Sequence, residues 1–191
     1  MNQRKPEYAI DPLFVNRWSP RALSTELMEE KDLMKLFEAA RWAPSSYNAQ
    51  QWRFIYAKRG TKEWETLFHL LVPFNQSWAK NAAYLVVILS RKRFEYNDEP
   101  SRTHSFDAGA AWQNLALQAT LLGLVAHGME GFDYERTRKE LNVPEKYDIE
   151  AMIAIGKPGK KEDLPPELQE REFPSDRKKI SEFIYEGTFK E

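Results

Sequence analysis

Hydrophobic residues recur along the chain with helical spacing in several segments. In residues 28–43 the apolar side chains fall three and four positions apart, which predicts an amphipathic helix. Thr61 is a suitable N-cap for a second helix over residues 61–71. A further helix is expected over residues 134–141. These segments alternate with shorter apolar stretches of a different kind.

Those shorter stretches predict strands. Residues 83–90 are almost continuously apolar, a pattern typical of a strand that is buried on both faces. Residues 52–57 and 150–156 are expected to form further strands. A presumed strand near residue 125 leads into a turn bounded by Gly128 and Gly131. Strands interleaved with helices indicate an α+β domain of packed layers.

The segment over residues 105–122 carries small or apolar residues on nearly every side, including Ala108, Leu115 and Ala119. A helix that is apolar all round is expected at the centre of a domain or in a subunit interface. Gly123 is placed to end this helix.

The two ends of the chain lack such periodicity. Pro6, Pro12 and Pro20 interrupt the first two dozen residues, which we expect to form an arm with one short helical turn. Residues 91–101 are polar and predict a loop. From Lys157 onward the chain is rich in proline and charge, which predicts a second extended arm with a short segment at residues 180–185. We therefore expect residues 1–191 to form a single domain with extended terminal arms.

Composition narrows the possible functions. The 42% hydrophobic content and the 6 Trp, 8 Tyr and 11 Phe residues suffice for a core. With 28 basic and 29 acidic residues, the chain has no strong field for nucleic acid or anionic lipid. No cysteine is present and the three histidines lack ligand spacing, so no metal site is expected. Without a leader peptide or a spanning segment, we expect a cytoplasmic protein with no membrane or nucleic-acid partner.

Two basic segments could bind phosphate. In an extended backbone, Arg17, Ser19 and Arg21 point to the same side, where two guanidinium groups and a hydroxyl could hold a dianion. Arg177 begins a basic run near the C-terminus that could add a contact. Taken alone, the first segment could equally be an exposed basic turn and the second a solvated charge cluster.

Two loops could bind a flat heteroaromatic ring. Residues 44–52 place Ser, Asn and Gln side chains beside loop amides, a mixture of donors and acceptors that suits the edge of such a ring. The glycines of residues 128–131 allow close approach to the backbone. A capping loop and a simple turn are the alternatives. The chain has no GxGxxG, Walker or GxSxG motif, so Rossmann, P-loop and serine hydrolase chemistry lack support.

The order of these motifs resembles the nitroreductase-like family of FMN-dependent oxidoreductases over roughly residues 8–185. The most specific element is Pro44-Ser45-Ser46-x-Asn48-x-Gln50. The other matching motifs, in chain order, are Arg17-x-Ser19-x-Arg21, Ala39 to Ser46, Asp107 to Leu115, Leu122-Gly123-Leu124, Glu130-Gly131-Phe132-Asp133, Ala154 to Pro158 and the basic C-terminal segment.

The resemblance implies the nitroreductase-like fold, a central and mostly antiparallel sheet flanked by helices, in a homodimer with FMN at the interface. It implies no catalytic side chain, because the chemistry belongs to the flavin. The implied cofactor contacts are Arg17, Trp18, Ser19, Arg21, Pro44, Ser45, Ser46, Asn48, Gln50, Asn75, Met129, Glu130, Gly131 and Arg177.

Within this set, the resemblance gives Arg17, Ser19, Arg21 and Arg177 the phosphate and ribityl end of FMN. Part of the shell around the ring would come from the second subunit. Two positions depart from the family pattern. Gln51 replaces a usual proline, and Trp78 lies where some members have a flavin-contacting lysine, with Lys80 as an alternative contact.

The implied activity is NAD(P)H-dependent reduction of nitroaromatics, quinones or enones, by hydride transfer through the bound flavin. NADH or NADPH would be the electron donor, and a small molecule would be the acceptor. Reductive dehalogenation and flavin fragmentation in the same fold are alternatives, with residues 91–101 long enough to form a lid. A flavin-binding protein without turnover is a third possibility.

Overall fold

A four-stranded sheet forms the centre of the computed structural model, which describes residues 4–190. The strands are β1 (Trp52–Lys58), β2 (Tyr84–Arg91), β3 (Val125–Met129) and β4 (Tyr147–Gly156), in the order β1-β2-β4-β3. All three neighbouring pairs are antiparallel, which confirms the expected α+β fold with an antiparallel sheet.

The sheet is buried on both faces, and β2 shows why its sequence is continuously apolar. Leu85 and Val87 belong to one hydrophobic cluster, whereas Val86 and Ile88 belong to another. Successive side chains of a strand point to opposite faces. The prediction of a doubly buried strand over residues 83–90 is therefore confirmed.

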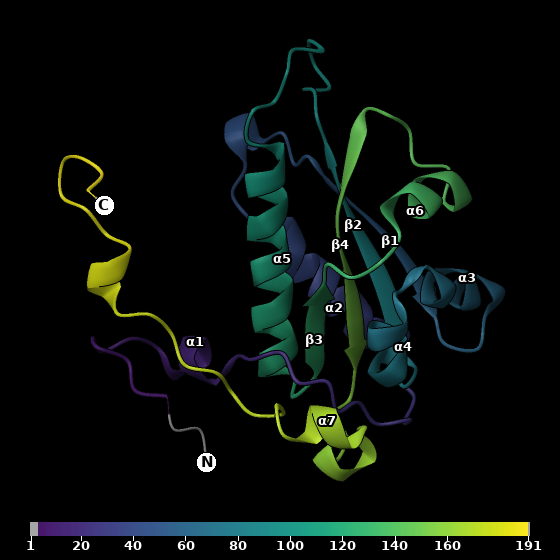
Figure 1. Ribbon diagram of the computed structural model, residues 1–191. Helices are drawn as coiled ribbons and strands as arrows, with labels where there is room; N and C mark the ends of the chain where they lie inside the picture. The colour runs from purple at the N-terminus through teal and green to yellow at the C-terminus, as the bar shows by residue number, and fades with distance from the viewer. Residues whose placement is uncertain (1–3, 191) are drawn as a thin grey trace.

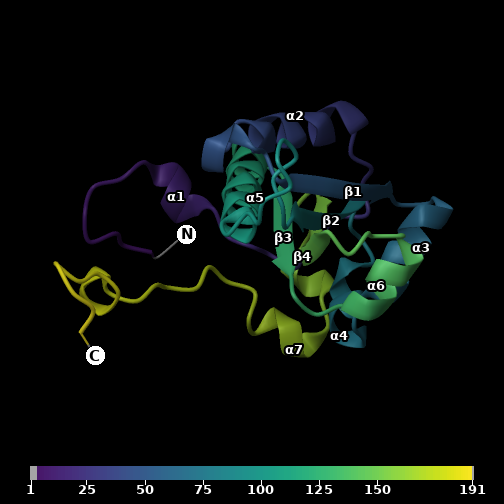
Figure 2. The ribbon, with the colours of Figure 1, turned by 90° about the horizontal axis from the view of Figure 1, so that it is seen from above.

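Helices cover both faces of the sheet. On one face lie α2 (Glu30–Arg41) and α5 (His104–Leu121), whose buried residues share a cluster with Val86 and Ile88 (Figure 2). On the other face lie α3 (Lys62–Leu70) and α4 (Pro73–Ala79). A shorter helix, α6 (Tyr134–Glu140), contacts α3. The molecule is thus a layered sandwich of helix, sheet and helix.

Helix α5 is the predicted central helix. Its alanines let it lie close to α2 and the sheet, and Gly123 ends it with a positive φ of 66°. Large apolar residues nevertheless remain exposed at both ends of the helix, Phe106 at its beginning and Leu121 at its end. Its predicted role in a subunit interface is not tested by a single chain.

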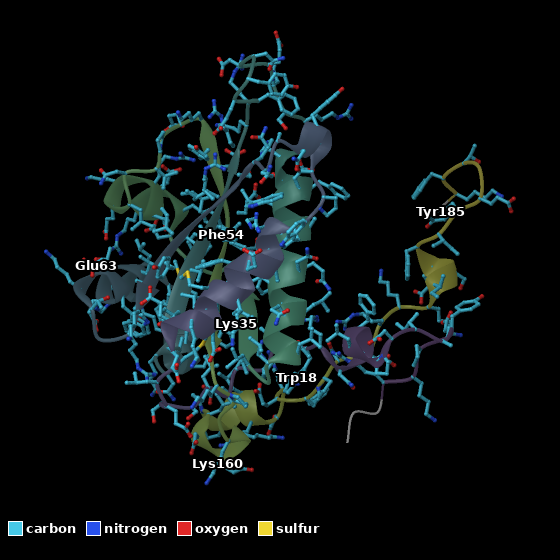
Figure 3. The ribbon with its side chains drawn as sticks, turned by 180° about the vertical axis from the view of Figure 1, so that it is seen from behind. Trp18, Lys35, Phe54, Glu63, Lys160 and Tyr185 are labelled. Atoms are coloured by element: carbon cyan, nitrogen blue, oxygen red, sulfur yellow. The ribbon has the colours of Figure 1, made fainter. Side chains whose placement is uncertain are left out.

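The terminal segments form two arms that run together away from the body (Figure 1). The N-terminal arm contains α1 (Pro12–Asn16), the expected helical turn, which is followed by an extended segment. The arms are joined where Arg4 Nε donates to the carbonyl of Ser175 at 2.6 Å. Figure 3 shows Tyr185 on the outer part of the C-terminal arm, away from the sheet. The first part of the C-terminal segment packs on the body instead, because Leu164 and Leu168, around η2 (Lys161–Asp163) and α7 (Pro166–Gln169), belong to the core. The extended arm predicted from Lys157 onward is therefore found only beyond α7, where it includes η3 (Ile180–Glu182).

The structure corrects the predicted turn at residues 128–131. Gly128 and Met129 belong to β3, where they pair with Ile153 and Met152 of β4, so only the second half of the segment is a turn. The helices α4 and α7 were not predicted, because each is short and begins at a proline that follows a break. In residues 4–190 no helix is both long and apolar enough to cross a bilayer.

Candidate cofactor site

The segment after α1 holds the predicted phosphate-binding residues. Arg17 ends the helix and continues as extended backbone, with its N–H donating to Leu13 O at 3.0 Å. Its Nη1 donates to Ser19 Oγ at 3.3 Å. Arg17, Ser19 and Arg21 line the same cavity, as does Trp18 between them, so their predicted alternation to one side of the backbone stays a prediction.

This cationic cavity, of about 310 Å³, is formed where the two arms meet the end of the sheet. Five arginines line it, and none of its described lining residues is acidic. The concentration of guanidinium groups suits a phosphate or another dianion. Its lining residues are Arg4, Arg17, Trp18, Ser19, Arg21, His127, Arg171, Phe173, Ser175 and Arg177.

Burial and mutual repulsion of the arginines favour binding of an anion in the cavity. Burial lowers the pKa of Arg17, and the positive charge of Arg177 lowers it further. Burial and the charges of Arg177 and Arg17 likewise lower the pKa of Arg4. All three stay charged, because arginine is not deprotonated in proteins. In addition, Arg21 Nε is buried without a hydrogen-bond partner among the described residues, which leaves a donor for an acceptor on a ligand.

Two buried side chains fix the backbone beneath these arginines. Glu172 Oε1 accepts from the N–H groups of Arg21 and Ala22 at 2.7 and 2.8 Å. His127, on β3, donates from Nδ1 to Pro20 O at 2.9 Å. Burial lowers the pKa of His127 to about 4, with a smaller contribution from nearby Arg21, so the ring is neutral at pH 7. The cationic segment is therefore anchored to both the sheet and the C-terminal arm.

A second cavity of about 380 Å³ adjoins the first and is called here the β3 cavity. The two cavities share Arg17 and Ser19. Gly128 lies against α5, where a Cβ would come within 3.2 Å of the Trp112 ring. An elongated ligand could place an anionic group among the arginines and a planar part along β3. The lining residues of the β3 cavity are Arg17, Ser19, Trp112, Gln113, Gly128, Met129, Glu130, Glu150 and Ala151.

The turn after β3 is supported from behind by α4. Asn75 Nδ2 donates to Gly131 O at 2.9 Å, while Asn75 Oδ1 accepts from Trp78 Nε1 at 3.3 Å. A Cβ on Gly131 would lie 2.7 Å from Asn75 Nδ2, so glycine permits this close packing. Asn75 and Trp78 are buried and line neither cavity, and Lys80 is exposed at the end of α4. Direct contact of any of these three residues with a cofactor remains a prediction.

The predicted ring-binding loop, residues 44–50, lies at the beginning of α5. Ser46 N donates to Asp107 Oδ2 at 3.1 Å, and Ser46 Oγ lies 2.7 Å from Thr103 Oγ1. Tyr47, Asn48 and Gln50 adopt positive φ angles of 54°, 53° and 50°. Such angles are unfavourable for residues other than glycine and are often found at functional sites. The loop is thus held in a strained but well-anchored conformation.

Within one chain this loop does not reach the two cavities. Trp18 shares a surface pocket with Thr120 and Gly123, which places the cationic segment near the end of α5. The loop contacts the opposite end of this helix, which is about 27 Å long. One chain therefore gathers Arg17, Trp18, Ser19, Arg21, Met129, Glu130 and Arg177. The predicted ring contacts that line neither cavity are Pro44, Ser45, Ser46, Asn48 and Gln50.

Several lining residues were not predicted from the sequence. Arg4 and Arg171 lie on the arms, where no pattern marks them, and Glu150 had been assigned only to a strand. His127 had been considered only as a metal ligand. No group of three or more His, Asp or Glu residues in the described part of the chain could hold a metal ion.

Comparison with known proteins agrees with this geometry. The model of the nitroreductase family matches residues 15–157. A crystal structure described as an oxidoreductase containing FMN superposes with a TM-score of 0.95 and 45% identity, covering 100% of this chain and 98% of that one. Protein DrgA of Synechocystis sp. is 30% identical in an alignment of length 167 that covers 69% of this chain and 78% of DrgA.

A third relative has a more specialised name. The iodotyrosine deiodinase of Thermotoga neapolitana is 27% identical over 168 residues, covering 74% of this chain and 84% of that protein. The family model spans the segment from Val15 to Lys157, which includes the cationic segment, the strained loop and all four strands. The chain therefore belongs to the nitroreductase family of oxidoreductases.

Proposed function

We propose that this protein is a homodimeric, FMN-dependent oxidoreductase that takes electrons from NADH or NADPH and reduces nitroaromatic, quinone or enone compounds. The observation that carries the proposal is the junction of the cationic cavity and the β3 cavity at Arg17 and Ser19. This junction suits a ligand with a phosphate at one end and a flat ring at the other. The likeness to an oxidoreductase containing FMN supports the same ligand.

The cationic cavity fits the phosphate of FMN. Arg17, Arg21 and Arg177 would surround a dianion, and Ser19 would donate a hydroxyl hydrogen bond. The unpartnered Arg21 Nε would gain an acceptor. The anion would also relieve the repulsion that lowers the pKa of Arg17. A bound phosphate would therefore offset the repulsion among the arginines and give Arg21 Nε a hydrogen-bond acceptor.

The β3 cavity fits the ring. Gly128 keeps the backbone close to α5, and Met129 and Glu130 form the end of the strand along which a planar group could lie. Asn75 fixes the turn that follows. When bound, FMN supplies two-electron redox chemistry, whereas the protein positions the ring and controls the approach of donor and acceptor.

A second copy of the chain would complete the shell. None of residues 44–50 of the strained loop lines either cavity of its own chain. Large apolar residues are exposed at the ends of α5 and on the C-terminal arm, and such residues are typical of a protein–protein interface. A two-fold dimer would bring each loop to the other chain's cavities and bury these residues. They are Phe106, Leu121, Phe183, Ile184, Tyr185 and Phe189.

The absorbance spectrum of the purified protein tests this function directly. We expect flavin absorption bands that co-purify with the protein and are bleached under anaerobic conditions by NADH or NADPH. Addition of a quinone should then restore the bands. A colourless protein that does not bind added FMN would refute the proposal. A yellow protein that neither nicotinamide bleaches would refute the proposed electron donor.

Reductive dehalogenation is the second candidate, and the likeness to an iodotyrosine deiodinase favours it. Residues 91–101 could contribute a lid, because Phe94 packs edge-on against exposed Tyr47 of the strained loop. Anaerobic incubation of the reduced protein with 3-iodotyrosine distinguishes the two candidates. Release of iodide at a rate comparable to quinone reduction would favour the deiodinase function, and its absence would exclude it.

A further inference from the structure

A network of polar side chains lies where α5 begins beside β2 and β4, and no role has yet been given to it. It consists of Ser90 on β2, His104 and Ser105 on α5, and Asp148 and Glu150 on β4. Ser90 is fully buried, whereas Asp148 is partly exposed. Glu150 also lines the β3 cavity. The network therefore connects that cavity to the molecular surface.

The hydrogen bonds in this network have a direction. Ser90 Oγ donates to Glu150 Oε1, because an ionised carboxylate only accepts. The Ser90 hydroxyl proton is used in that hydrogen bond. In the 2.7 Å hydrogen bond between Ser90 Oγ and His104 Nδ1, the ring N–H must therefore be the donor. Ser105 Oγ donates to the same carboxylate oxygen at 2.7 Å and lies 3.3 Å from His104 Nδ1. The hydrogen bonds thus point from the imidazole, through Ser90, to Glu150.

The other ring nitrogen faces the outside. His104 Nε2 lies 3.9 Å from Asp148 Oδ2, and Lys92 Nζ lies 3.4 Å from Asp148 Oδ1. An imidazole can take up a proton on one nitrogen while it releases one from the other. His104 is therefore placed to pass a proton from this outer side towards Ser90.

The same residues could suggest a Ser-His-acid hydrolase, but the geometry opposes that reading. The fully buried Ser90 cannot reach a substrate, and its hydroxyl donates to Glu150 rather than to the imidazole. In a serine hydrolase the nucleophilic hydroxyl donates its proton to the imidazole base. The network is arranged to move a proton, not to activate a nucleophile.

We propose that His104, Ser90 and Glu150 form a proton relay that supplies the β3 cavity during substrate reduction. The inference rests on the proposed function. Reduction of a quinone by NAD(P)H gives a hydroquinone and NAD(P)⁺, and consumes one proton from the medium. In the relay, a proton that enters at His104 Nε2 displaces the Nδ1 proton to Ser90. The Ser90 proton passes to Glu150, and the resulting carboxylic acid protonates the quinone oxygen.

Charged groups lie at both ends of the proposed relay, beside Glu150 and beside His104. The acidic Glu130 and the basic Arg17 line the same cavity as Glu150. The charges of Glu130 and Glu150, after burial, raise the pKa of Tyr134, which places this phenol near both carboxylates. At the outer end, Asp148 Oδ2 faces His104 Nε2, and Lys92 pairs with Asp148 Oδ1. A pH profile of the reaction would report all of these groups together.

Nitrogen-15 NMR of the flavin-free protein tests the direction of the relay without any turnover. We expect neutral His104 to carry its proton on Nδ1, and the signal can be assigned with His104→Gln because the chain has only three histidines. Replacing both hydroxyls, in Ser90→Ala/Ser105→Ala, should shift the tautomer towards Nε2–H. Ser101→Ala is the matched control, since Ser101 is buried but its Oγ has no described partner. A wild-type Nε2–H tautomer would overturn the proposal.

Kinetics of the FMN-loaded enzyme provide the second test. Loss of a positioned proton donor should slow quinone reduction by about tenfold or more in Ser90→Ala and Glu150→Ala. Bleaching by NAD(P)H should be unchanged in Ser90→Ala, because Ser90 lines neither cavity. Added acetate should rescue quinone reduction by Glu150→Ala in proportion to its concentration. Ser101→Ala should behave as wild type.

The outcomes separate the relay from the proposed function. If wild type binds no FMN or reduces no quinone, the function fails before the variants are compared. If wild type is active and both variants keep the wild-type rate, the relay alone is refuted. A slow Glu150→Ala variant that acetate does not rescue would indicate a structural role for Glu150 and would also overturn the relay.

Discussion

At the scale of single residues, Arg17 has the most testable role because it lines both cavities. Arg17→Ala removes a charge-assisted hydrogen bond to the proposed phosphate, so FMN affinity should fall by about 1.5–3 kcal/mol. Fluorescence titration of flavin-free protein with FMN measures this change. Arg136→Ala is the control, since this exposed arginine pairs with Glu140 on α6. Equal retention of FMN by both variants would contradict the assignment of Arg17.

His127 should make the stability of the flavin-free protein depend on pH. Its pKa is lowered to about 4 in the fold, from 6.5 in a model compound. Between these values the unfolded chain binds a proton that the folded chain excludes. The free energy of unfolding should therefore decrease as the pH falls from 6.5 to 4, by about 3 kcal/mol in total from this residue.

Urea denaturation between pH 4 and pH 7 measures this effect. His127→Asn keeps a donor for Pro20 O but cannot titrate, so it should lose the share of the pH dependence that His127 contributes. His69→Asn, at an exposed position on α3, controls for removal of a histidine. The same pH dependence in His127→Asn and in wild type would show that His127 is protonated alike in the folded and unfolded states.

At the scale of elements, Asp107 joins the strained loop to the first turn of α5. Its buried carboxylate accepts from Ser46 N. Asp107→Ala leaves that N–H without its partner, and the free energy of unfolding should fall by about 1–3 kcal/mol. Asp107→Asn retains an acceptor and should lose less. Thermal unfolding of the two variants gives the comparison, and equal losses would mean that the hydrogen bond to Ser46 contributes little.

The sequence predicted the longer elements because their patterns are local. The apolar period of α2, the unbroken apolar run of β2 and the alanine-rich α5 are each visible in one stretch of sequence. The end of β3 was misplaced because Gly128 and Met129 are fixed by pairing with β4, more than twenty residues later. Helix α4 was missed because seven residues after a proline give too short a window for a period.

The residues of the candidate site could likewise be predicted only where they lie close together in the sequence. The Arg17-x-Ser19-x-Arg21 motif is local in the sequence, and the fold brings its three residues to one cavity. Trp112 and Glu150 come from a helix and a strand that only the tertiary fold brings together, so no sequence pattern could assign them to the site. The strained loop could be recognised from its residues, but its position relative to the cavities is a property of the tertiary fold and of the proposed dimer.

At the scale of the whole molecule, the two arms act as one clamp. Gly159 N donates to Ala22 O at 2.9 Å, and Ser24 N donates to Lys157 O at 2.9 Å. A Cβ on Gly159 would lie 2.6 Å from the carbonyl carbon of Leu23, so the segments are as close as backbone allows. Because each arm contributes arginines to the cationic cavity, the clamp couples the ends of the chain to anion binding.

The proposed dimer makes the last prediction, which concerns Phe106. This residue is 78% exposed on the first turn of α5, beside the strained loop that a second chain would use. An aspartate there would have to be desolvated at an apolar interface, which is strongly unfavourable. Phe106→Asp should therefore shift the protein towards monomers in sedimentation equilibrium. FMN should be lost with the dimer, because the loop of the other chain leaves the site.

Phe74→Asp provides the matched control. Phe74 is 50% exposed on α4, on the face of the sheet opposite α5, so its replacement should leave the dimer intact. If Phe106→Asp stays dimeric and keeps FMN, the interface does not include the beginning of α5. If it becomes monomeric yet binds FMN as tightly as wild type, each chain holds a complete site. The strain in residues 44–50 would then require an explanation within one chain, because no partner's cofactor would depend on that loop.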